Sequence, residues 1–232
     1  CNPATLDSEP PPTCSDSAVT SGVTALALAS ALDLCQTTLA GVPKAQQTWG
    51  LLSAELLRSD GSPPSAAQLA DLQDLQTAVL TDYGTVLPHR GPTFVGLSTG
   101  AMRDADDPGY VPPSPGTDLG WSGSPPAAYL AANGNQLPGS SGCSGACPGG
   151  TGANDGVLLR LQIRVPTNAG SFSLDHRFFS AEAPANLCTN RNDFALGLLT
   201  SAVPGIPLDK NVLFDTLFSP LSVNNAFFDV CS

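Results

Sequence analysis

Charged side chains are scarce in this chain of 232 residues, and cations are scarcer than anions. Only 12% of residues are charged, and 9 lysines and arginines stand against 20 acids, which gives a net charge of −11. Phosphate backbones and anionic lipid repel such a chain, so neither nucleic acid nor a membrane surface is an expected partner. No stretch approaches the roughly 18 apolar residues of a membrane helix, and the most apolar window, residues 22–34, is short and Ala-rich.

Aromatic residues are also few, at 6%, whereas glycine and proline are abundant, with 23 and 22 copies. So little charge and so much glycine and proline argue against a helical bundle. The composition favours a β-rich extracellular domain with long loops.

Seven cysteines, an odd number, indicate an oxidising compartment and therefore an exported protein. Cys1 is the candidate odd cysteine. It is either an ordinary half-cystine or the acylated first residue of a bacterial lipoprotein. Residues 143–147 have a spacing that zinc tolerates, but no second Cys/His pair stands at ligand spacing, so a disulfide is favoured there. Closeness in sequence favours pairing Cys143 with Cys147, Cys188 with Cys231, and Cys14 with either Cys1 or Cys35.

Hydrophobic periodicity predicts short strands and few helices. A period of 3.6 predicts helices at 20–34 and 65–81. Residues 104–156 hold 20 Pro or Gly among 53 residues and are predicted to form one long loop without regular structure. The predicted strands are 47–57, 93–98, 157–165, 171–180, 193–200, 211–214 and 226–231. A helix is the alternative at 47–57.

The clearest strand signal is the alternation of residues 157–165, where Arg160 and Arg164 share one face and Leu159 and Ile163 share the other. Short strands at this spacing are typical of a mainly β fold. We expect an antiparallel β-sandwich, jelly-roll-like, with one or two flanking α-helices and the long Pro/Gly-rich loop. An extended arm at 1–17 precedes a single domain at 18–232.

Several segments carry a family resemblance. They are 97–100 (LSTG), 107–110 (DPGY), 165–169 (VPTNA), 171–175 (SFSLD), 178–182 (FFSAE), Cys188, 192–195 (NDFA) and 222–228 (SVNNAFF). Together they resemble the choice-of-anchor L domain of secreted bacterial proteins, which is frequent in myxobacteria. The resemblance implies export and attachment to the cell surface, and it implies no activity.

The end of the chain departs from that family. Such domains usually continue for several strands after the segment resembling 224–231, so the sandwich is expected to lack its last strands. Unpaired strand edges are templates for another chain. The missing strands are expected from a complementing C-terminal fragment, or from a neighbouring copy that adds its arm at 1–17 by strand addition. A chain cut short is the alternative.

Acidic residues offer a candidate calcium site. Asp104, Asp106 and Asp107 cluster on a loop, as hard oxygen ligands of Ca²⁺ often do, although the EF-hand pattern is absent. A second carboxylate group, Glu182 and Asp193, lies in the segment that most resembles the family. The alternative is a solvated turn in which the aspartates cap backbone amides.

Residues 96–100 match G-x-S-x-G and make Ser98 a candidate hydrolase nucleophile, with Asp155 and His176 following in a suitable order. That motif needs a helix directly after the serine, and the sequence predicts turns there. His176 stands among phenylalanines and leucines, where a core histidine is expected.

The leading hypothesis is therefore a non-enzymatic structural or adhesive protein of the cell surface that self-associates, such as a filament subunit. A glycan-binding module that uses Tyr110 and Trp121 of the long loop is the first alternative. A serine hydrolase at Ser98 is the second.

Overall fold

The computed structural model divides the chain into two compact units. Unit 1 comprises residues 1–58, 62–112 and 157–175, and unit 2 comprises 59–61, 113–156 and 176–232. The structure describes residues 14, 16–138, 152–187, 189, 191–215 and 218–224. Most of the predicted arm and the predicted strand at 226–231 lie outside these residues. The expectation of one domain over 18–232 stays a prediction.

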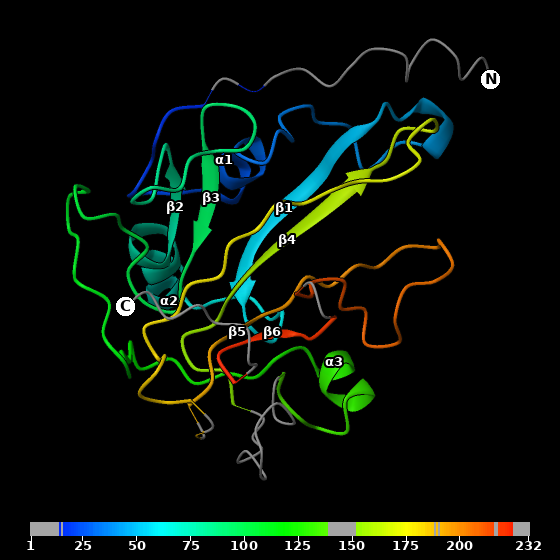
Figure 1. Ribbon diagram of the computed structural model, residues 1–232. Coiled ribbons are helices and arrows are strands. Elements are labelled where there is room, and N and C mark those ends of the chain that lie inside the picture. Colours follow the sequence, from blue (N-terminus) through cyan, green and yellow to red (C-terminus); the bar gives the residue numbers. More distant parts are fainter. Residues whose placement is uncertain are drawn as a thin grey trace. The chain divides into compact units, whose positions relative to one another are not determined.

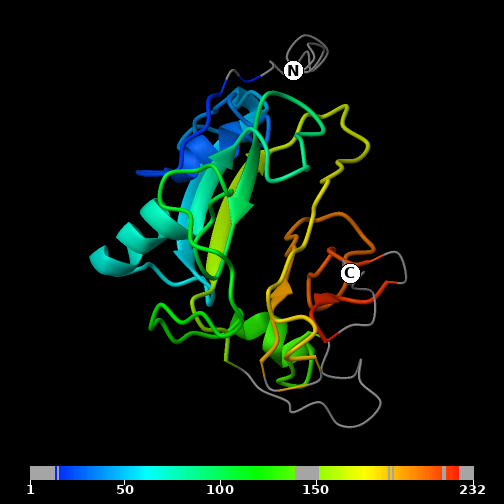
Figure 2. The same ribbon diagram turned by 60° about the vertical axis from the view of Figure 1, so that its left-hand side comes forward.

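The longest element of unit 1 is an antiparallel ribbon of β1 (Gly50–Arg58) and β4 (Val157–Arg164), which run side by side in Figures 1 and 2. The pairing is regular except for a shift between Leu51 and Ser53. Both strands were predicted from their alternation, and both predictions are confirmed.

The two faces of this ribbon have opposite chemistry. Leu56 of β1 is buried, and its cross-strand partner Leu159 packs on the core of the unit. On the other face, Glu55 stands opposite Arg160, and both side chains are exposed. Leu57 shares the face of Glu55 but is buried, so this second face is open to water at Glu55 and Arg160 and covered at Leu57.

Helix α1 (Ala25–Ser30) is shorter than the predicted helix at 20–34. Thr24 is its N-cap, and its side-chain oxygen accepts a hydrogen bond from the Ala27 N–H at 3.1 Å. Leu28 is fully buried, so the apolar face of the helix supplies the core. A single 3-10 turn (Lys44–Gln46) lies between α1 and β1.

Helix α2 (Ala66–Asp71) begins with a capping box, in which Ser65 and Gln68 each accept the other's backbone N–H. It continues as one π-helical turn, η3 (Leu72–Gln76). The helical prediction at 65–81 is therefore confirmed only up to residue 76.

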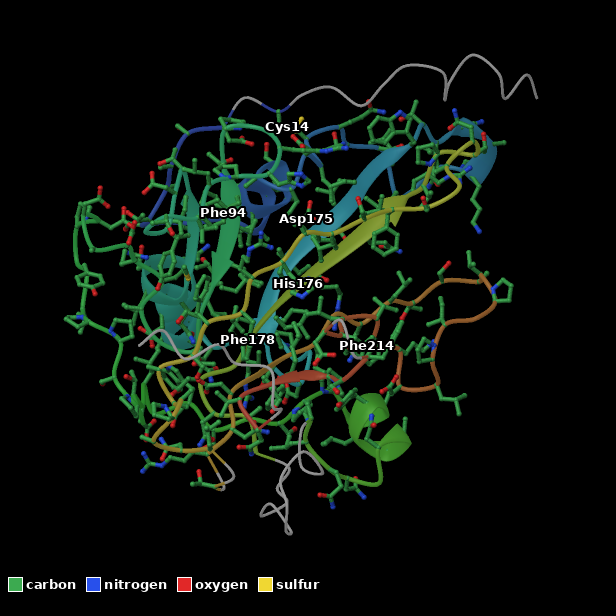
Figure 3. The ribbon with its side chains drawn as sticks, in the orientation of Figure 1. Cys14, Phe94, Asp175, His176, Phe178 and Phe214 are labelled. Carbon is green, nitrogen blue, oxygen red and sulfur yellow. A yellow bond between two sulfur atoms is a disulfide. The ribbon has the colours of Figure 1, made fainter. Side chains whose placement is uncertain are left out.

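The last residues of that predicted helix form a strand instead. Strand β2 (Thr77–Leu80) is buried throughout and pairs antiparallel with β3 (Phe94–Leu97). Thr77 donates its hydroxyl to the Leu72 carbonyl at 2.7 Å, which closes the helix end. The strand prevails over the helical spacing because β3 offers it a complete hydrogen-bonding partner. The predicted strand at 93–98 is confirmed by β3, which carries Phe94 (Figure 3).

One hydrophobic cluster joins the elements of unit 1. Its buried members come from α1, β1, η3 and β2 and from the segment before α1, and Val95, Val157 and Leu159 of β3 and β4 pack against it. The buried members are Val23, Leu28, Leu56, Leu72 and Val79. Fully burying a side chain of this size contributes about 1.5–3 kcal/mol, so each buried member of the cluster stabilises the unit appreciably.

Unit 2 has little regular structure. It contains α3 (Ala127–Ala132) and a short antiparallel pair, β5 (Phe194–Ala195) with β6 (Leu221–Ser222). Isolated bridges join Leu198 to Asn211 and Phe214 to Pro220. The predicted strands at 193–200 and 211–214 are thus reduced to a two-residue strand and bridges.

The long loop predicted at 104–156 contains helix α3, which sequence reasoning missed. The Ala-rich helix begins directly after Pro126, its N-cap, and proline is common at the start of a helix. Tyr129 and Leu130 are buried, so packing of these two side chains holds a helix too short to be stable alone.

The strand predicted at 171–180 is wrong. Residues 165–180 form neither a strand nor a bridge, and Figure 3 shows Asp175, His176 and Phe178 on this irregular segment. Phe172 is 68% exposed, and His176 is exposed rather than buried on an apolar face. An alternating pattern becomes a strand only when another strand pairs with it, and no described residue supplies one.

The fold is mainly β, with three short helices and antiparallel strand pairs, and none of its sheets is closed among the described residues. No helix in the described part of the chain has the length and apolarity needed to cross a membrane.

Candidate functional site

Three aspartates of unit 1 form an acidic cluster. Asp82 lies two residues after the end of β2, and Asp104 and Asp106 lie on a turn further along the chain. One carboxylate oxygen from each lies within 4.8 Å of the others. They line a hollow of about 120 Å³ together with Asp107 and the backbone around residues 80–81.

Backbone amides organise this acidic cluster. The Asp104 carboxylate accepts the N–H groups of Gly84 and Ala105, each at 2.7 Å. These hydrogen bonds hold the pKa of Asp104 below its usual range, and the bond from Gly84 has the larger effect. Asp107 accepts the Asp104 N–H at 2.7 Å and thereby closes the turn. Of the three predicted ligands, Asp104 and Asp106 lie in the cluster, whereas Asp107 shapes the turn.

Sequence reasoning missed Asp82 as a member of this cluster. The sequence around it was predicted as the end of a helix, and only the strand pairing of β2 directs the chain so that Asp82 meets a turn 22 residues later. A carboxylate two residues after a buried strand was the signal that could have found it.

Three carboxylates at this spacing suit a hard cation, and calcium stays the prediction for this cluster. Bound Ca²⁺ would relieve the repulsion of the three like charges and stabilise unit 1. If the Kd is about 0.1–1 mM, about 5 mM Ca²⁺ should raise the Tm of unit 1 by about 2–6 °C over an EDTA control. Asp106→Asn should abolish the rise, and Asp118→Asn, outside the cluster, should keep it. A Tm indifferent to both Ca²⁺ and EDTA contradicts the prediction.

The second predicted carboxylate group belongs to unit 2. Glu182 is buried and accepts the Gly116 N–H at 2.9 Å and the side-chain amide of Asn186. Asp193 accepts the Ser180 hydroxyl, and burial raises the pKa of Asp193 despite this hydrogen bond. Protein donors already occupy these oxygens, so the pair stabilises loops of unit 2. Among the described residues it is not part of a three-ligand cluster.

Arg103, directly before the acidic turn, is a buried cation with an exposed fraction of 5%. Its guanidinium donates to carbonyls from three separate segments of unit 1, and so ties the entry to α1, the end of η3 and the acidic turn together. The accepting carbonyls are those of Thr20, Asp74, Leu75 and Met102. Sequence reasoning missed this role, because an arginine beside aspartates normally indicates an exposed charge.

Asp74 strengthens the same junction. Its carboxylate accepts the Gly22 N–H at 2.7 Å and the Ser21 hydroxyl at 2.8 Å. These two bonds and the nearby Arg103 charge hold the pKa of Asp74 below its usual range. The carboxylate therefore fixes the chain just ahead of α1.

Ser98 follows strand β3, as a hydrolase nucleophile would, but residues 99–104 form no helix. Its hydroxyl accepts the Gly100 N–H at 2.9 Å and so stabilises a local turn. Asp155 is buried in unit 2, where its two oxygens accept the N–H groups of Leu119 and Trp121, each at 2.9 Å. The nucleophile-elbow geometry is not formed, and Asp155 serves to hold the long loop.

The two aromatics considered for glycan binding lie in different units. Tyr110 is exposed in unit 1, and its N–H donates to the Asp107 carbonyl at 3.2 Å. Trp121 is half-buried in unit 2. Each is held by its backbone within its own loop.

Cys14 forms a disulfide with Cys35, which resolves the choice between Cys35 and Cys1. The Cα atoms are 5.8 Å apart, and Cys14 is buried. The bond fixes the chain ahead of α1 to the segment that follows it. The other five cysteines, Cys1, Cys143, Cys147, Cys188 and Cys231, lie outside the described residues.

Strand β4 has an open edge. Among the described residues its one neighbouring strand is β1, although β4 spans eight residues. At its C-terminal end, Ile163 and the following Val165 are 39% and 54% exposed. The edge therefore combines unused hydrogen-bonding capacity with uncovered apolar side chains.

The solvent face of this edge is basic. Arg160 lies 3.6 Å from the Glu55 carboxylate across the ribbon. Arg164 stands opposite Gly50, so β1 offers it no carboxylate, and its buried Nε has no hydrogen-bond acceptor among the described residues. Among the described residues, the Arg160 guanidinium therefore has a carboxylate beside it across the ribbon, and the Arg164 guanidinium has none.

Comparisons with family models, with curated proteins and with solved structures gave no match to this chain. The resemblance to the choice-of-anchor L domain accordingly stays a prediction.

Proposed function

We propose that this protein is a non-enzymatic structural or adhesive component of the bacterial cell surface, and that its copies assemble by strand addition at the open edge of β4. The single observation that carries the proposal is this edge. Eight residues of regular strand have one neighbour among the described residues, and Ile163 and Val165 are exposed at its end.

Strand edges left open are a hazard that proteins usually block with prolines, lysines or a covering loop. Strand β4 contains no proline and no lysine, and its core-facing residues are leucine, isoleucine and valine. A strand added here would gain a full ladder of backbone hydrogen bonds, which is the source of affinity in strand addition.

The proposal extends to the architecture. The β1–β4 and β2–β3 ribbons surround one core, as do the layers of the expected jelly-roll-like sandwich, and an added strand would widen the β1–β4 layer. The strand comes from a second copy or from a complementing C-terminal fragment.

Two observations support an exported location for a protein of this function. The Cys14–Cys35 disulfide is compatible with an oxidising compartment, and the resemblance to surface-attached proteins points to the same location. Lipidation of Cys1 and binding of Ca²⁺ at the acidic cluster belong to the same proposal, since both are common at cell surfaces.

Blocking the edge tests the proposal. We expect the wild-type chain to form larger species as its concentration rises, measured by size-exclusion chromatography with light scattering and by negative-stain imaging. Ile163→Lys should weaken association at least roughly tenfold, because it buries a charge in the added layer.

Leu208→Lys is the matched control, since Leu208 is an exposed apolar residue in a loop of unit 2. It should assemble as the wild type does. The proposal is wrong if the wild type stays monomeric at every concentration, or if the two lysine variants behave alike.

A further inference from the structure

We propose that the strand added at β4 is residues 4–9 of a second copy of this chain. This inference rests on the proposed function and names the partner segment. It depends on the pattern of side chains that β4 presents on its two faces.

On its solvent face, β4 requires carboxylates from its partner. Arg164 has Gly50 opposite it on β1. Within the described part of the chain its guanidinium makes one hydrogen bond of 3.3 Å, from Nη1 to the Val165 carbonyl. The buried Nε has no acceptor among the described residues. A carboxylate on a strand at the open side of β4 would lie beside this guanidinium and compensate it.

On its core face, the same end of β4 requires an apolar partner. Ile163 and Val165 are exposed there, whereas their neighbour Leu159 packs on the core. A suitable donor strand therefore alternates, with acidic side chains on one face and small or apolar side chains on the other.

Residues 4–9 (ATLDSE) have this alternation. In an extended strand Thr5, Asp7 and Glu9 share one face, and Ala4, Leu6 and Ser8 share the other. Acids two residues apart occur at one further place in the sequence, Asp104 and Asp106, and those belong to the acidic cluster of unit 1. With Asp7 beside Arg164, Leu6 or Ser8 would cover Ile163 and Val165.

A second β4 strand is a poorer occupant of the same edge. Pairing two copies of β4 antiparallel brings Arg160 and Arg164 of each copy onto one shared face, where like charges repel. The acidic segment at 4–9 replaces this repulsion with attraction.

Charge reversal tests the assignment in the full chain carrying Cys1→Ser, which removes an intermolecular disulfide as a cause of association. Arg164→Glu alone, and Asp7→Lys with Glu9→Lys, should each weaken association roughly tenfold or more, measured by light scattering across a concentration series. The combination of both sets should restore association, because the charges are again opposite. Arg90→Glu, an exposed charge outside β4, should leave it unchanged.

The outcomes separate the donor from the function. If Ile163→Lys and Arg164→Glu abolish association but the Asp7 and Glu9 changes do not, another segment such as 226–230 is the donor, and the inference is wrong while the proposed function stands. If the combined variant does not recover, the pairing of the two segments is also wrong. If the parent chain never associates, the proposed function itself fails.

Discussion

Arg103→Met is expected to lower the free energy of unfolding of unit 1 by about 3 kcal/mol. The guanidinium is buried, and it satisfies four backbone carbonyls from three segments. Methionine fills much of the volume but removes the guanidinium as a donor to these carbonyls, of which that of Leu75 keeps a further donor, the Met102 N–H at 2.8 Å. The junction between the entry to α1, the end of η3 and the acidic turn would lose its connection.

The measurement can be confined to unit 1. Trp49 is buried in unit 1 and Trp121 lies in unit 2, so a Trp121→Phe background leaves Trp49 fluorescence as the reporter of urea unfolding. Arg103→Lys should be intermediate, since an ammonium group reaches fewer carbonyls. Arg90→Met, at an exposed position, should change stability by less than about 0.5 kcal/mol. Equal losses for Arg103→Met and Arg90→Met would contradict the account of the junction.

Removing the described disulfide is the second change with a large expected effect. Cys14→Ser with Cys35→Ser should cost unit 1 about 3 kcal/mol, because a cross-link across 21 residues restricts the unfolded chain. Urea unfolding in the same Trp121→Phe background measures the loss. The double serine variant avoids leaving an unpaired thiol.

Its outcome also bears on the compartment. Under reducing conditions the free energy of unfolding of unit 1 in the parent chain should fall by the same amount. The double serine variant has no Cys14–Cys35 bond to reduce, so it should not show this fall. A parent chain whose unit 1 is equally stable with and without reductant would show that the bond contributes nothing and would remove one support for export.

The sequence predicted best where local pattern and tertiary pairing agree. Residues 157–165 alternate clearly, so the pattern identified β4, and β1 is its partner. The looser pattern of 47–57 left a helix open as the alternative, and pairing with β4 decides for the strand β1. Strand β3 was found because a short apolar run between turns predicts a strand, although only Gly96 of it is buried.

Prediction failed where pairing decided the outcome. The leucine spacing of α2 continues smoothly into residues 77–80, yet those residues pair with β3, so the helix ends before them. The opposite failure occurs at 171–180, where a strand-like pattern finds no strand to pair with among the described residues. Helix α3 was missed because two buried side chains, rather than a periodic pattern, hold it.

The candidate site shows the same division. Asp104 and Asp106 are neighbours in sequence and were predicted together, whereas Asp82 joins them only through the fold. An open edge was expected at residues 224–230, which lie outside the described residues except for Asn224, and the open edge of β4 was not predicted. Which edge is left open depends on the pairing of every strand, and the sequence of a single strand does not contain that information.

Hydrogen–deuterium exchange of the β4 backbone amides, followed as the protein concentration rises, tests the central claim most directly. Strand addition predicts that the amides of residues 157–164 that point away from β1 become protected in step with the growth of larger species, and that Ile163→Lys removes this protection. Assembly that leaves the β4 amides exchanging at an unchanged rate would contradict it.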